Sequence, residues 1–358
     1  MYFNKEPLGC NTLNRSNGNL ANAGILDFMK KIIVLLVLFQ CLALSAEARC
    51  RGKDILNRMD PVFLSSLQKA TDSHPCAVGR YWEITKDGKT SWVIGTAHLD
   101  DRRIKRVPRF FSKKIRKARV VQVEATPAQM HEYLRFKEKQ KQANIKKALR
   151  NSGKPTRSYF STEEWKDIAR VVKQKGIDLE LLNRLSAGAV ATLLQKPPCE
   201  TKAKTFLDIE IMTQALKSKV PLIGLDEIGQ IKKDYSTGNR SKSFYINLAK
   251  LNLARQKNAA NFAETRIQMY RRGEIMKIWE FEKALLRRMT QNKAILRALS
   301  DGFNKTIVKR NKKWLPKIRS QIDKGNVVIA VGALHLPGKN GLLYLLKRKG
   351  YQIKRLGI

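Results

Sequence analysis

Short apolar runs separated by helical segments constrain the fold of this chain more than any other feature. Between the runs lie segments with helical spacing, such as the one from Ser161 to Lys175, where Ser161 and Glu164 form a capping box and Gly176 supplies the stop. Strands that alternate with helices form a largely parallel sheet. We therefore expect an α/β fold with a largely parallel central sheet flanked by helices. The four runs are Trp92–Ile94, Val120–Val123, Pro221–Leu225 and Val327–Val331.

Two further segments extend this sheet, and two others lack strand patterns. The segment from Tyr81 to Leu99 predicts a hairpin around the turn at 86–89, and Tyr351 to Leu356 predicts a last strand. Residues 131–205 and 240–310 are long, basic and helical in pattern, with apolar residues at helical spacing. We expect them as helical insertions that cover the edge or mouth of the sheet.

The N-terminal residues have the pattern of an export signal. Residues 29–48 combine a charged start, a short apolar run and a small-residue cleavage site, as secretory signals do. Residues 1–28 are polar, and we expect them to be a non-native or disordered extension. The mature chain, 49–358, then forms one domain that is periplasmic or secreted. An inner-membrane signal anchor is the alternative, although the run is shorter than the roughly 20 residues that span a bilayer.

Cysteine usage fits export. Of five cysteines, Cys50, Cys76 and Cys199 lie in the expected mature chain, and their spacing fits no zinc ribbon or CxxC redox motif. In an oxidising compartment we expect one structural disulfide, for which Cys76 with Cys199 is our prediction.

The formal net charge of +41 first suggests a nucleic-acid partner. The lysines and arginines are scattered over every expected helix, and no zinc finger, aromatic RNA-binding strand or glycine-rich phosphate loop accompanies them. Export argues against nucleic acid as well. Anionic envelope polymers are the partners that this charge fits, with membrane association peripheral at most.

Two segments repeat one local design, a glycine at a strand end and a histidine three residues later. They contain Gly95 with His98 and Gly332 with His335, which are half of the four histidines in the chain. Reactive groups collect at the carboxyl ends of parallel strands, and a glycine there lets the backbone turn sharply. We therefore expect both histidines at the rim of one crevice. The other two, His74 and His131, lack this placement, and we interpret them as surface residues.

Two more expected strands end in acids, Glu124 and Asp226. In a parallel sheet these strand ends lie at the same rim as the two histidines. The expected site therefore contains two imidazoles and two carboxylates. This set suits Mn, Co, Fe or Zn, and an open coordination position generates a nucleophilic water. Neighbouring residues on a strand face opposite sides, so Glu227 is the alternative to Asp226. Arg310, at the end of a helical pattern, is a candidate to stabilise an oxyanion or to orient a carboxylate.

The segments around these residues resemble the TraB/GumN family from about Tyr81 to Leu356. The opening motif is Trp-Val-Ile-Gly-Thr-Ala-His, which ends at His98, and the closing signature is Val-Gly-Ala-Leu-His-Leu-Pro-Gly, which contains His335. Between them, Leu207-Asp208, Gly224-Leu225, Arg272-Gly273-Glu274 and Arg310-Asn311 come in the family's order. Where relatives have Gly-Leu-Glu, this chain has Asp226, one carbon shorter.

The resemblance implies a fold and a class of reaction. The family is similar to Tiki-type metalloproteases and, more remotely, to erythromycin-esterase-like and haem-binding ChaN-like proteins, which implies a shared α/β core with an inserted helical layer. His98, His335, Glu124 and Arg310 carry over from the family motifs.

Three functions follow as hypotheses. The first is metal-dependent hydrolysis of a peptide or protein, with His98, His335, Glu124 and Asp226 at the metal and Arg310 stabilising charge. The second keeps these residues without a metal, as in an esterase, with a histidine as general base. The third is a non-catalytic periplasmic binding or assembly protein that docks on anionic polymers.

Overall fold

The computed structural model describes residues 52–99, 101–149, 154–195, 205–229 and 240–357. The expected extension (1–28), the signal (29–48) and Cys199 lie outside the described residues. The export signal and the Cys76–Cys199 bridge therefore stay predictions. No helix in the described part of the chain is long and apolar enough to cross a membrane.

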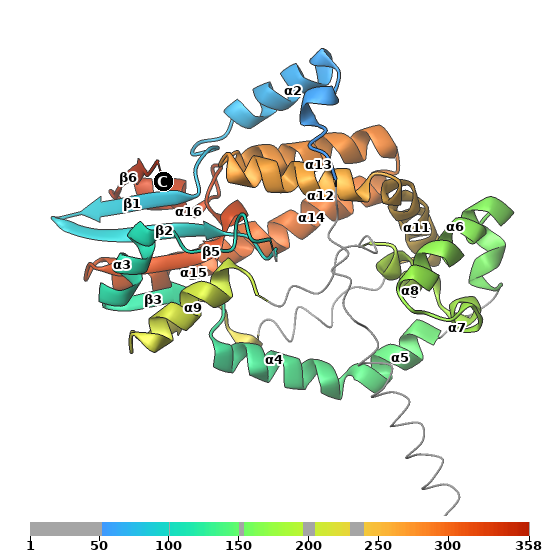
Figure 1. Ribbon diagram of the computed structural model, residues 1–358, viewed down its shortest axis with the longest axis horizontal. Coiled ribbons are helices and arrows are strands. Elements are labelled where there is room, and N and C mark those ends of the chain that lie inside the picture. Colours follow the sequence, from blue (N-terminus) through green and yellow to red (C-terminus); the bar gives the residue numbers. More distant parts are fainter. Residues whose placement is uncertain (1–51, 100, 150–153, 196–204, 230–239, 358) are drawn as a thin grey trace, which may run out of the picture. The chain divides into compact units, whose positions relative to one another are not determined.

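The described residues contain a six-stranded sheet in the order β4-β3-β5-β2-β1-β6 (Figure 1). Its strands β4, β3, β5 and β2 run parallel, while β1 pairs antiparallel with both β2 and β6. This confirms the α/β class with a largely parallel sheet. The bounds are β1 Tyr81–Lys86, β2 Lys89–Thr96, β3 Val120–Val123, β4 Leu222–Gly224, β5 Val327–Gly332 and β6 Gln352–Arg355.

Local signals in the sequence are confirmed where they are tested. The hairpin of β1 and β2 turns at Asp87 and Gly88, whose φ angles of 49° and 71° match the two-residue turn that suits twisted strands. The expected capping box forms, because Ser161 accepts from the backbone of Glu164 while the Glu164 carboxylate accepts from the backbone of Ser161. The helix that it starts is α6, Thr162–Gln174.

Helices pack against both faces of the sheet. Along β5, Val327, Ile329 and Val331 belong to the apolar core on one face, and Val328 and Ala330 belong to the core on the other. The first core includes α15 (Lys309–Ile322) and α16 (Leu342–Lys347), and the second includes α3 (Arg109–Lys117) and α9 (Leu207–Lys217). This double burial explains why β5 reads as an uninterrupted apolar run.

The remaining helices form cores of their own. One core joins α6, α7, α8 and α11, and another joins α2, α12 and α13. The bounds are α2 Pro61–Asp72, α4 Pro127–Lys139, α5 Lys141–Leu149, α7 Leu179–Arg184, α8 Ala187–Leu193, α11 Lys242–Gln256, α12 Ala259–Arg271, α13 Ile275–Met289 and α14 Lys293–Phe303, with 3₁₀ turns at Leu56–Arg58, Thr156–Tyr159 and Ala333–His335.

Arg310 does not end a helix, as the sequence pattern suggested. A π-helical turn, Asn304–Val308, joins α14 to α15, and Arg310 is the second residue of α15. The extra residue in a π turn rotates the helix that follows it, and such turns occur often at functional sites. The expectation was wrong because helical spacing in the sequence continues unbroken across the junction.

Candidate functional site

The carboxyl ends of the four parallel strands meet at one edge of the sheet. There, β5 lies between β2 and β3, and β4 lies beyond β3. His98 follows the end of β2, Glu124 follows β3, Asp226 follows β4 and His335 follows β5. The topology therefore delivers all four predicted site residues to the same edge, as the pattern of strand ends indicated.

His335 is buried and held in one orientation. Its side chain is 3% exposed, and its Nδ1 lies 2.6 Å from Oδ1 of Asn311. The amide group of Asn311 donates to the backbone carbonyls of His335 and Asn340, so its oxygen faces the ring. An amide oxygen only accepts, so Nδ1 carries the hydrogen and Nε2 keeps a free lone pair. The ring of Trp314 packs against the imidazole with centroids 4.4 Å apart.

Glu124 faces the free nitrogen of His335. Its Oε1 lies 3.8 Å from Nε2 and accepts the backbone N–H of Gly332 at 2.7 Å. Its Oε2 accepts from Nη2 of Arg310 at 2.6 Å. Burial raises the pKa of Glu124, but the nearby His335, the charge of Arg310 and the Gly332 N–H outweigh burial and lower it. Glu124 is therefore a carboxylate at neutral pH.

His335 is neutral under the same conditions. Burial, with smaller effects from Arg310 and His98, lowers its pKa to about 4 against the opposing effect of Glu124. A neutral imidazole leaves Arg310 as the cation that keeps Glu124 ionised at neutral pH. The same neutrality leaves Nε2 able to accept a proton or to bind a metal.

Arg310 joins the two acidic strand ends. Besides Glu124, it binds Asp226 in a bidentate pair, with Nε 3.1 Å from Oδ1 and Nη2 2.6 Å from Oδ2. Trp314 also donates its indole N–H to Oδ1 of Asp226 at 2.9 Å. Both oxygens of Asp226 are thus engaged, which favours an orienting role over that of a metal ligand. Glu227 is 72% exposed and binds Lys317, so Asp226 is the acid that faces the site.

His98 lies on the open side of the site. Its side chain is exposed, and its ring contacts that of Phe206 with centroids 4.9 Å apart. Its electrostatic effect lowers the pKa of Glu124 and that of His335. The expectation of two histidines at a rim holds for His98 and is wrong for His335, because α15 and the residues after β5 cover the second ring.

Asp208, in the first turn of α9, is a further carboxylate near His98. It is 7% exposed, and its Oδ1 accepts the hydroxyl of Thr96 at 2.6 Å. Its Oδ2 is buried without a hydrogen-bond partner. Burial raises the pKa of Asp208 despite the opposing effects of His98 and Thr96.

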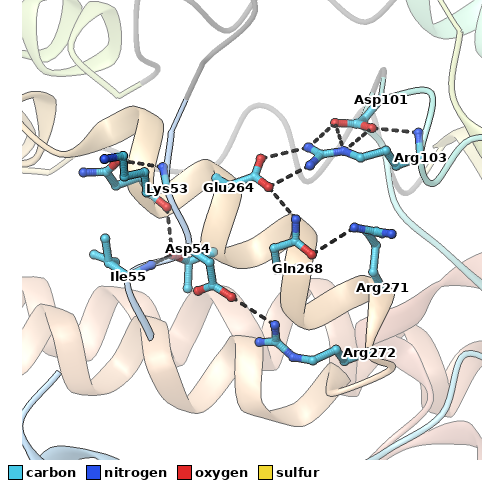
Figure 2. Close-up of polar contacts among 11 residues, drawn as sticks. Lys53, Asp54, Ile55, Asp101, Arg103, Glu264, Gln268, Arg271 and Arg272 are labelled. Carbon is cyan, nitrogen blue, oxygen red and sulfur yellow. Dashed lines mark hydrogen bonds and ion pairs between the residues drawn. The ribbon is translucent and has the colours of Figure 1, made fainter. Parts of the chain in front are cut away.

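The segment after His98 is held by a partly exposed ion pair (Figure 2). Arg103 donates to both oxygens of Glu264 on α12, at 2.7 and 2.8 Å, and to Asp101. The hydrogen bonds from Arg103 lower the pKa of Glu264. Ile104 next to it is buried against Tyr270 and Ala333. This anchor limits how far the backbone that carries His98 can move.

The two motif glycines permit close packing, not the sharp turn that the sequence suggested. Neither has a positive φ. A Cβ on Gly95 would lie 2.8 Å from Cδ1 of Leu336 and 3.1 Å from Cβ of Ala333, which belong to the second motif. A Cβ on Gly332 would lie 3.1 Å from Oε1 of Glu124. The motifs therefore pack directly on each other and on the carboxylate.

Replacing Gly95 by alanine is expected to destabilise the fold by about 1–3 kcal/mol, because the added methyl overpacks the contact between the two motifs. Thermal unfolding followed by circular dichroism measures this as a lower Tm. The control is Gly302→Ala on α14, where nothing lies within 4 Å of the added Cβ. There alanine stabilises the helix by up to about 1 kcal/mol. Equal Tm values for wild type and Gly95→Ala would contradict the packing argument.

Acid is expected to destabilise the fold through His335. Its pKa is about 4 in the folded chain against 6.5 for an ordinary histidine, so between these values only the unfolded chain binds the proton. Stability then falls with falling pH by about 1.4 kcal/mol per pH unit. Glu124, whose pKa is lowered, adds a loss in the same direction below its usual 4.5.

Urea unfolding at pH values between about 7 and 5 measures this slope. His335→Gln removes the titrating group, so the difference in unfolding free energy between the two proteins isolates its contribution. A difference that does not change with pH over this range would show that His335 is not kept neutral by burial.

Of the remaining histidines, His131 is exposed on α4, as predicted. His74 is not a simple surface residue, because it is half-buried and its Nε2 lies 3.1 Å from the buried Glu280. Together with Met276, Phe303 and residues 337–340 it lines a cavity of about 360 Å³. This cavity adjoins the segment that follows His335.

Two histidines and a carboxylate are ligands that first-row divalent metals accept. The free Nε2 of His335 and the remaining lone pair on Oε1 of Glu124 lie 3.8 Å apart, which suits two ligands of one ion. As placed, no group of three or more His, Cys, Asp or Glu among the described residues is close enough to hold a metal. A third bond therefore requires the exposed His98 side chain to turn toward the pair.

Three side chains of the site were not assigned from the sequence: Asn311, Trp314 and Asp208. Trp314 lies four residues after Arg310 and three after Asn311, spacings that bring it beside each of them on a helix. Asp208 starts a helix beside the strand end that carries Thr96. These signals identify candidates only once Arg310 and Thr96 are known to face the site.

The likeness to known proteins lies in the family and not in an individual protein. No curated protein matches the chain. The family model for TraB/PrgY/gumN matches residues 81–355. This range includes all the described strands. It also includes the six site side chains His98, Glu124, Asp208, Asp226, Arg310 and His335. The matched range is more than half of the 358 residues, and the chain belongs to the TraB/PrgY/gumN family.

Proposed function

We propose that this chain is a hydrolase whose reaction centre consists of His335, Glu124 and Arg310, with His98 facing them from β2. The observation that carries the proposal is the fixed tautomer of His335. Asn311 holds the hydrogen on Nδ1, so the free Nε2 points toward a carboxylate that Arg310 keeps ionised. A buried imidazole prepared in this way accepts a proton or binds a metal, and structural packing alone does not need the arrangement.

The groups present suit cleavage of an acyl bond, and a peptide bond is the substrate class that we propose. Attack on a carbonyl places negative charge on its oxygen, and a fixed guanidinium such as Arg310 stabilises that charge. Asp226 and Trp314 hold Arg310 in place. In the metal-free form of this reaction, His335 and Glu124 orient the attacking water and take up its proton.

We propose that His98, His335 and Glu124 hold a divalent metal ion of the Mn, Co, Fe or Zn type. When bound, such an ion supplies a water of lowered pKa at neutral pH. Asp226 acts on the site through Arg310. Export to the periplasm or medium is part of the proposal and rests on the pattern of residues 29–48.

The experiment uses the full chain purified without chelator and a library of fluorogenic peptides together with simple esters. We expect peptide turnover that a chelator removes and that one of the four metals restores, with metal bound at about one ion per chain in elemental analysis. Turnover that persists after complete metal removal would favour the metal-free, esterase-like reaction of the same residues.

A binding function is the second candidate, and the net charge of +41 is the observation that favours it. Binding to an anionic polymer weakens steeply as salt rises and does not depend on one neutral imidazole. Strong salt-sensitive binding, unchanged in His335→Gln and without turnover under any metal, would replace the enzymatic proposal by this one.

A further inference from the structure

The side chain of Asp208 has an unusual environment for a buried carboxylate. Its Oδ1 accepts a short hydrogen bond from Thr96, two residues before His98, while its Oδ2 is buried and has no partner. A buried carboxylate oxygen without a donor is costly, and folded proteins keep such groups where a partner or ligand completes them. A donor is therefore expected beside Oδ2.

His98 is the side chain placed to supply that donor. Asp208 binds Thr96, two residues before His98, and the charge of His98 opposes the effect of burial on the pKa of Asp208. The His98 ring also packs on Phe206, the N-cap residue of α9, two positions before Asp208. The exposed imidazole can thus close on Oδ2 by a side-chain rotation that leaves the backbone in place.

The environment of His335 shows the same design in completed form. An aromatic ring, Trp314, supports its imidazole, and a polar acceptor on the same helix, Asn311, binds one ring nitrogen. For His98 the aromatic ring is Phe206 and the acceptor is Asp208, both at the start of α9. Each histidine is then oriented by its own helix: α15, on one face of the sheet, orients His335, and α9, on the other face, orients His98.

We propose that Asp208 is the positioning residue of His98, and that its Oδ2 accepts the ring N–H on the side of α9. This bond fixes which nitrogen of His98 carries the proton and leaves the other free to face Glu124 and His335. Carboxylates that bind the far nitrogen of a reactive or ligating histidine act in this way. The consequence for catalysis rests on the proposed function, whereas the hydrogen bond itself does not.

The test is the tautomer of His98, read from ring ¹⁵N shifts of the full chain labelled at histidine. The four histidines are assigned by single His→Gln substitutions, and spectra are taken at about pH 8.5, above the usual histidine pKa. We expect one tautomer of His98 in wild type and in Asp208→Asn, whose carbonyl still accepts. Asp208→Ala should give a mixture of both tautomers while His335 stays unchanged.

Controls separate positioning from general destabilisation. Glu282→Ala removes a carboxylate paired with Arg255 and Arg266 and should leave the tautomer of His98 unaltered. Thr96→Val removes the bond that orients Asp208, and should shift His98 in the same direction by less. It also supplies the test if Asp208→Ala does not fold. An unaltered His98 in both Asp208→Ala and Thr96→Val overturns the proposal.

Hydrolysis provides the second measurement. If the proposed function holds, Asp208→Ala lowers turnover by about 10–100-fold and Asp208→Asn restores most of it. Absence of turnover in the wild type would count against the hydrolase proposal alone, because the tautomer of His98 is measured without substrate. A normal rate in Asp208→Ala together with mixed tautomers would overturn the catalytic consequence.

Discussion

If the chain is the proposed hydrolase, His335→Gln is expected to lower the rate of hydrolysis at least about 100-fold, because it removes the nitrogen that faces Glu124. Glutamine keeps an amide N–H that can still donate to Asn311, so the buried acceptor stays satisfied. Alanine is a poorer test. It would empty the space beside Trp314 and leave Oδ1 of Asn311 without its partner at a site that is 3% exposed.

The rate is measured on the best peptide from the library, and far-ultraviolet circular dichroism confirms that the variant is folded. His131→Gln on α4 is the matched control, since its side chain is exposed, and it should keep the wild-type rate. If His335→Gln retains more than about a tenth of the wild-type rate, His335 does not take part in the chemistry.

The strands of the fold were predictable because each carries its own local signal. Between turns, β5 is apolar at every position, as burial on both faces requires, and the strand appears where the pattern placed it. Parallel order then fixes that β2, β3, β4 and β5 end at one edge. Glu124 and the two motif histidines were predictable for the same reason, since each directly follows such an end.

Contacts between distant segments were not predictable. The glycines of the two motifs are explained by the other motif and by Glu124, so no local rule for turns accounts for them. The choice between Asp226 and Glu227 likewise depended on where Arg310 and Trp314 lie, on a helix more than 80 residues away. Spacing along the chain identifies such groups but not their partners.

Burial was the property that the sequence concealed most. Both histidines follow strand-end glycines, yet His335 is enclosed and His98 is exposed, because Asn311 and Trp314 of α15 pack against the ring of His335. The two histidines therefore differ in what each side chain can do. An enclosed imidazole is kept neutral and fixed, while an exposed one can move to meet a ligand, and a site that binds and releases a substrate uses both properties.

Arg310→Met is expected to destabilise the fold by about 3–5 kcal/mol, because it leaves two buried carboxylates without their cation. Glu124 and Asp226 both bind Nη2 of Arg310 at 2.6 Å, and their side chains are only 16% and 10% exposed. Lysine retains the charge but not the planar fork, so Arg310→Lys should fall between methionine and wild type. Urea unfolding at neutral pH measures all three.

The pH dependence shows whether charge is the cause. Without Arg310, Glu124 loses a cation that lowers its pKa and takes up a proton more readily, so the stability difference from wild type should shrink as the pH falls from about 7 to 5. Lys317→Met, on the same helix, removes a pair with the exposed Glu227 and a bond to the carbonyl of Leu225, and its small effect on stability should not change with pH over this range. The guanidinium of Arg310 also lies over the ring of Trp314, 4.4 Å from its centroid. If Arg310→Met loses the same stability at every pH in this range, lost packing on Trp314 is the cause and charge is not. The cause of the loss bears on the proposed reaction. A guanidinium that neutralises the two carboxylates is also held in place by them. A developing oxyanion requires a cation in such a fixed orientation.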